Sequence, residues 1–86
     1  MKYRKKLVEV EAHCFTYENM ELKEVPPMWV VQAIDSGKIY RHHHKIYIRT
    51  LEGDMRVKEG DYIVKGVKDE LYACEPNIFK LTYEAV

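Results

Sequence analysis

The chain has 86 residues, of which 47% are hydrophobic and 12% aromatic, so we expect one small domain spanning residues 1–86. Its 14 basic and 14 acidic residues cancel, which argues against long-range attraction of the whole domain to nucleic acid or to an anionic membrane. No apolar run approaches the roughly 20 residues of a membrane-spanning helix or forms a signal-peptide core, so we expect no contact with a membrane.

Residues 7–16, LVEVEAHCFT, alternate between apolar and polar side chains. The apolar parity comprises Val8, Val10, Ala12 and Cys14. This alternation predicts a strand with one buried and one solvated face, and Phe15, which breaks the parity, marks its end. Residues 17–24 have no clean period and are expected to form a loop.

Residues 25–37, VPPMWVVQAIDSG, are the one segment with the pattern of a helix. Pro26 or Pro27 suits the first helical turn, and Gly37 suits the position just past the end. The inward side is expected to carry Met28, Trp29, Ala33 and Ile34, with Val30 or Val31 at its edge. Because about ten residues are too few for a helix to persist alone, we expect it to pack on a sheet and to bury most of Trp29.

From Lys38 onward the apolar period is two, which indicates short strands joined by turns in an antiparallel meander. The expected strands are 38–41, 45–50, 55–57, 62–65 and 70–74. Pro76 should then redirect the chain so that Phe79 closes the core, with residues 78–80 forming a single helical turn and residues 81–86 returning as an edge strand. The expected fold is α+β: a small curled antiparallel sheet of five to six strands with one short helix.

Several stretches resemble a family of small proteins encoded by bacteriophages and prophages of Gram-positive bacteria. They are KYRKK, VEVEA, PMWVVQAIDSGKIY, TLEGDM and, most specifically, GDYIVKGVKDELYACEPNIFKLTYE. The chain departs from the family where Ala73 replaces a frequent proline and where His42, His43 and His44 replace a short polar turn. The resemblance implies a phage-borne cytoplasmic protein and no catalytic activity.

Aromatic and basic residues interleave in the hairpin expected over residues 38–50: Tyr40, Arg41, Lys45, Tyr47 and Arg49. The Tyr40 ring could stack on a base while the cations hold phosphates. Against this, neighbouring strand residues face opposite sides, so Tyr47 should lie opposite to Ile46 and Ile48. The alternative interpretation is a solvated sheet face with extended lysine and arginine side chains.

Metal binding and catalysis have weaker support. His42, His43 and His44 could bind a metal with His13, but adjacent side chains diverge, so we expect an exposed turn without metal or cofactor. Cys14 and Cys74 form no CxxC pair, and a secreted domain of this size would carry more cysteines, which predicts reduced thiols in the cytoplasm. Pairing Cys74 with a histidine as a nucleophile is a generic pattern, and alternation around it favours a packed thiol.

These patterns lead to a noncatalytic binding protein that acts in the bacterial cytoplasm on a protein partner or by self-association. The alternative is a nucleotide- or nucleic-acid-binding protein that counters a host defence. A small hydrolase is the least favoured hypothesis.

Overall fold

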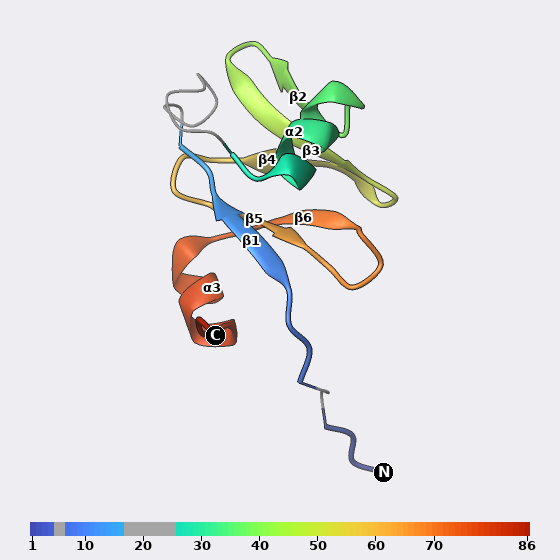
Figure 1. Cartoon of the computed structure of the whole chain (residues 1–86), viewed down its shortest axis with the longest axis vertical. Helices are drawn as coiled ribbons and strands as arrows, with labels where there is room; N and C mark the ends of the chain where they lie inside the picture. The colour runs from blue at the N-terminus through green and yellow to red at the C-terminus, as the bar shows by residue number, and fades with distance from the viewer. Residues whose placement is uncertain (5–6, 17–25) are drawn as a thin grey trace.

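The computed structural model describes residues 1–4, 7–16 and 26–86, which form six strands and two helices (Figure 1). In chain order these are β1 (Glu11–Cys14), α2 (Met28–Asp35), β2 (Ile39–His42), β3 (Lys45–Thr50), β4 (Gly53–Val57), β5 (Tyr62–Lys65), β6 (Leu71–Cys74) and α3 (Pro76–Thr82). The α+β class is confirmed. The single sheet of five to six strands is wrong, because the strands form two antiparallel sheets of three: sheet A in the order β1-β5-β6 and sheet B in the order β2-β3-β4.

The turn between β4 and β5, where the chain leaves sheet B, is hydrogen-bonded to Phe15, the residue that follows β1. The Phe15 amide donates to the Asp61 carbonyl at 2.8 Å, and the Gly60 amide donates to the Phe15 carbonyl at 2.8 Å. The buried Asp61 carboxylate accepts a hydrogen bond from the Lys58 amide at 2.9 Å, and Gly60 has a φ of +92°. These contacts hold the β4–β5 turn at β1, and β5 therefore pairs with β1 instead of continuing the meander beside β4.

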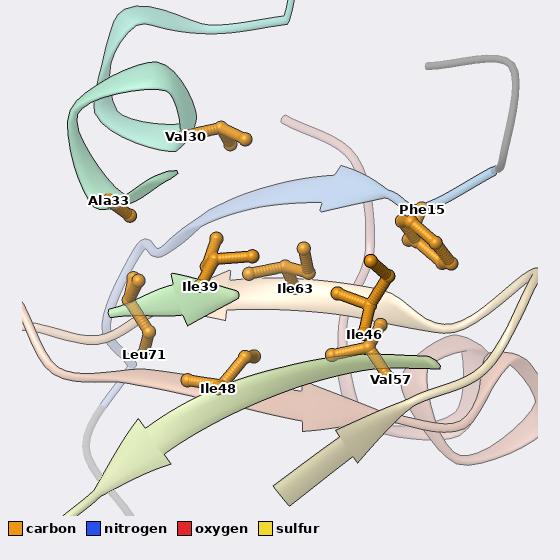
Figure 2. Close-up of a cluster of buried hydrophobic side chains, with 9 residues drawn as sticks. All are labelled: Phe15, Val30, Ala33, Ile39, Ile46, Ile48, Val57, Ile63 and Leu71. Carbon is orange, nitrogen blue, oxygen red and sulfur yellow. The ribbon is translucent and has the colours of Figure 1, made fainter. Parts of the chain in front are cut away.

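The main core lies between the inner faces of the two sheets and beneath α2 (Figure 2). Strand β3 contributes Ile46 and Ile48, whose alternation with Tyr47 and Arg49 is the pattern of a sheet with one buried face. Strand β6 contacts both β3 and β4, so the two sheets cover one another. The buried cluster comprises Phe15, Val30, Ala33, Ile39, Ile46, Ile48, Val57, Ile63 and Leu71.

Helix α2 forms where the sequence predicts, but Val30 lies further inward and Met28 further outward than expected. Gly37 follows its end with a φ of +83°, as expected for a residue past a helix terminus. Val30 and Ala33 are buried, and Trp29 and Ile34 pack against the core with most of Trp29 covered, as expected. Met28 is 68% exposed, so its expected inward position is wrong. The helix begins at Met28, and residues two apart point to nearly opposite sides of a helix, so burying Val30 exposes Met28.

Strand β1 is shorter than predicted. It begins at Glu11, opposite Lys65, and the chain turns away at Gly66, so β5 offers residues 7–10 no partner. Leu7 and Val8 are accordingly exposed. The strand does end at Cys14 before Phe15, as expected, and the loop predicted over 17–24 falls outside the described residues.

The C-terminal segment is helical from Pro76 to Thr82, so the helical turn expected at residues 78–80 is confirmed and the expected edge strand over 81–86 is wrong. Pro76 occupies the first turn of α3, where its missing N–H costs no hydrogen bond. Phe79 was predicted to close the main core, and this is wrong because Phe79 is not part of the core cluster. It packs against Tyr62 on the other side of sheet A, where Val64 is also buried.

Candidate functional site

The outward side of sheet B gathers aromatic and basic side chains. Cross-strand pairing places Tyr40 opposite Tyr47, Tyr47 opposite Arg56, and Arg49 opposite Asp54. Opposed residues share a face, and Ile46 and Ile48 point to the core, so these side chains face away from it. We call this surface the outer face of sheet B; it comprises Tyr40, His42, Lys45, Tyr47, Arg49, Asp54 and Arg56.

A tyrosine pair occupies the centre of this face. The rings of Tyr40 and Tyr47 stack with centroids 5.4 Å apart and planes inclined by 19°. The Arg49 guanidinium lies 5.0 Å from the centroid of the Tyr40 ring, within cation–π distance. The Tyr40 hydroxyl donates to the Asp54 carboxylate, and this bond raises the pKa of Tyr40 above its usual 10.0. Tyr40 is therefore a neutral, fixed support against which the Tyr47 ring is held.

Four of the five predicted site residues meet on the outer face: Tyr40, Lys45, Tyr47 and Arg49. Arg41 does not, because it pairs with Ile46 and so lies on the opposite side of the sheet. The structure adds Arg56, next to Tyr47 on β4. The apolar residues on either side of Arg56, Met55 and Val57, alternate with it, and this signal could have placed Arg56 outward from the sequence.

Charge is distributed unevenly along the chain. Residues 38–58, which include all of sheet B, contain six of the 14 basic residues and only Glu52 and Asp54 as acids. The other residues contain eight basic and 12 acidic ones. The net charge of zero thus combines a basic sheet B with an acidic remainder, and such asymmetry is typical of proteins that bind polyanions.

The histidine turn is shorter than expected. His42 belongs to β2, and the two turn residues are His43 and His44, with φ values of +49° and +64°. Two consecutive residues with positive φ match the tight hairpin turn that suits the twist of antiparallel strands. All three histidines are exposed, and the described residues contain no group of three or more metal-binding side chains.

The two cysteines lie too far apart for a disulfide, and Cys74 lacks the setting of an activated nucleophile. Cys14 and Cys74 both lie opposite Tyr62, on either side of β5, so two strand spacings separate them. That is about 9–10 Å, beyond the Cα separation of a disulfide. Burial, followed by the nearby Asp61 and Glu75 carboxylates, raises the pKa of the Cys74 thiol, and a raised pKa lowers the thiolate fraction.

A groove of about 650 Å³ adjoins the outer face. It lies between the β3–β4 turn and β6. Its lining includes basic, acidic and apolar side chains: Lys38, Arg49, Glu52, Glu70, Leu51, Met55 and Leu71. Leu51 is fully exposed and Met55 is 38% exposed. Arg49 belongs both to this lining and to the outer face, so the two surfaces are continuous.

Comparison of the chain with protein-family models, curated proteins and solved structures finds no match. Within the part of the chain that the structure describes, no helix is long and apolar enough to cross a membrane.

Proposed function

We propose that this chain is a noncatalytic binding protein that captures single-stranded nucleic acid on the outer face of sheet B. The observation that carries the proposal is the stacked Tyr40–Tyr47 pair with cations around it. Proteins that bind single strands combine aromatic rings, on which bases stack, with basic side chains that follow the phosphates.

The geometry assigns different roles to the two tyrosines. Tyr40 is held by Tyr47, Arg49 and the Asp54 carboxylate, so it supports the stack. Tyr47 lies at the middle of the central strand and offers its ring to a base. Lys45 and Arg49 lie two residues to either side of it, about 7 Å away along β3, and Arg56 lies beside it on β4. Cations therefore surround the stacking ring on three sides.

The setting of this activity rests on the resemblance to phage and prophage proteins. It supports expression in the cytoplasm of a bacterial host, where a captured strand or nucleotide could belong to a host defence. The raised pKa of Cys74 supports a role without catalysis, because the thiol is a weak nucleophile near neutral pH.

A protein partner, or a second copy of the chain, is the other candidate. The observation in its favour is the exposed Leu51 and Met55 beside the groove, since exposed apolar side chains at a hollow mark many protein contacts. The outer face favours nucleic acid, because charged residues such as lysine are depleted at the centres of protein interfaces.

Fluorescence anisotropy with labelled single-stranded DNA and RNA of about 12 nucleotides tests the proposal. Tyr47→Ala should weaken binding about tenfold or more, since stacking on an aromatic side chain contributes about 1–3 kcal/mol per base. Tyr3→Ala, which removes an exposed tyrosine outside the strands of sheet B, is the matched control and should bind as the wild type does. Equal affinity of the two variants, or no binding by the wild type, would refute the proposal.

A further inference from the structure

We infer that the groove between the β3–β4 turn and β6 receives one unstacked base of the strand that the outer face binds, while Arg49 holds the adjoining phosphate. This inference rests on the proposed function and extends it to a second subsite. The preferred ligand is then a single strand, in which a base is free to leave the stack, and a duplex, whose bases are paired, should bind more weakly.

Arg49 connects the two subsites. Its guanidinium lies over the Tyr40 ring on the outer face, and the residue also lines the groove. Lys38 lines the groove as well, and its carbonyl accepts a hydrogen bond from the Arg49 amide at 2.8 Å, so the two basic residues are neighbours. A strand that leaves Tyr47 thus meets Arg49 first, which belongs to both surfaces.

The groove is suited to a flat apolar group. Its volume of about 650 Å³ lies within the range of small-molecule sites, about 300–1,000 Å³. On the inner face of β4, Val57 is buried, but Met55 is left partly exposed at the groove. A thioether makes favourable contacts with an aromatic ring, and the exposed Leu51 side chain lies in the same lining. An inserted base would therefore cover apolar surface that is otherwise in water.

The occupant follows from this continuity. The apolar surface begins beside Arg49, where the outer face is positively charged, and a nucleotide combines an anionic phosphate with an aromatic base. The groove lining itself carries no net charge, because Glu52 and Glu70 balance Lys38 and Arg49, so the phosphate is expected at Arg49 on the outer face and the uncharged base in the groove.

Methyl NMR of the full chain with ¹³C-methyl methionine and labelled tyrosine rings tests the inference. The probes are an oligodeoxyadenylate and an abasic oligonucleotide with the same backbone. The oligodeoxyadenylate should shift Met55 upfield through the ring current of the inserted base and leave Met28, on the exposed side of α2, unchanged. The abasic strand should not give the upfield shift at Met55.

The outcomes separate this inference from the proposed function. If oligodeoxyadenylate shifts the Tyr47 ring signals but not Met55, the groove is not a base site and binding to the outer face stands. If neither residue responds, the proposed function fails and the inference fails with it.

A pair of variants gives an independent test by affinity. Leu51→Ser should weaken oligodeoxyadenylate binding about threefold or more by removing apolar contact in the groove. It should not change the affinity for the abasic strand. Leu81→Ser, which removes an equally apolar and 85% exposed side chain from α3, is the matched control. Equal affinity of the two variants for oligodeoxyadenylate would contradict the inference.

Discussion

The Phe79 ring lies parallel to the Tyr62 ring, with centroids 3.9 Å apart and planes inclined by 8°. This stack joins α3 to the side of sheet A that faces away from the main core. Tyr83 packs on Phe79 with centroids 5.0 Å apart, and its hydroxyl lies 2.8 Å from the Tyr72 hydroxyl. Helix α3 has seven residues and none is buried, so these aromatic contacts are what hold it in place.

Phe79→Ala should lower the free energy of unfolding by about 2–3 kcal/mol, somewhat less than for a fully buried phenylalanine, because Phe79 is only half-buried. Urea denaturation measures this change, and hydrogen exchange should show the amides of α3 losing protection first. Ile78→Ala, on the exposed side of the same helix, should cost less than about 1 kcal/mol. Equal effects of the two variants would show that α3 is held by some other contact.

The Tyr72–Tyr83 pair predicts a loss of stability in alkali. Burial, together with the hydrogen bond to Tyr83, raises the pKa of Tyr72 above its usual 10.0. The unfolded chain then releases this proton at lower pH than the folded chain. The contribution of Tyr72 to the free energy of unfolding is therefore constant below about pH 10 and falls as the pH rises above it. Urea denaturation from pH 8 to 11 should show a steeper fall above pH 10 in the wild type than in Tyr72→Phe. Parallel curves would contradict the assignment.

Asp61→Ala should destabilise the protein by about 1–3 kcal/mol. The buried Asp61 carboxylate accepts the Lys58 amide, and its loss leaves that donor unpaired at the turn that directs β5 to β1. Asp69→Asn removes the exposed charge whose ion pair with Lys65 spans 3.5 Å and keeps a side chain that tolerates the φ of +63° at this position, so it should cost less than about 1 kcal/mol. Thermal denaturation of both variants checks the difference, and a smaller effect for Asp61→Ala would rule out this role of the turn.

The corrected face of α2 can be tested by paired valine substitutions. Val30→Ala should cost about 2 kcal/mol because it removes two methyl groups from a buried position. Val31→Ala changes the same atoms at a half-buried position and should cost less than about 1 kcal/mol. Denaturant midpoints measure the two effects. The original assignment, with Met28 inward, would instead be supported if Met28→Ala were the more damaging substitution.

Local features could be predicted from the sequence because short-range patterns determine them. The alternation of Ile46 and Ile48 with Tyr47 and Arg49 identified both faces of β3, and Gly37 marked the end of α2. The Arg56 contribution was missed, although the same alternation contains it.

Long-range features could not be predicted in this way. The split into two sheets depends on the bonds between Phe15 and the Gly60–Asp61 turn, and alternation does not identify which strand pairs with which. The helical turn at residues 78–80 was expected, but the segment from Leu81 was mistaken for a strand because Leu81 and Tyr83 alternate with polar residues. The spacing of four between Phe79 and Tyr83 was the helical signal. The whole-chain charge also concealed the basic character of residues 38–58.

The salt dependence of single-strand binding tests the central claim most directly. The logarithm of the binding constant should fall linearly with the logarithm of salt concentration, with a slope of about 0.7 for each phosphate contact. In the double variant Arg49→Gln/Arg56→Gln the slope should be smaller by about 1.4, whereas Lys68→Gln/Lys80→Gln, which removes two cations away from sheet B, should keep the wild-type slope. A slope unchanged by loss of Arg49 and Arg56, or an equal reduction in both double variants, would contradict binding on the outer face of sheet B.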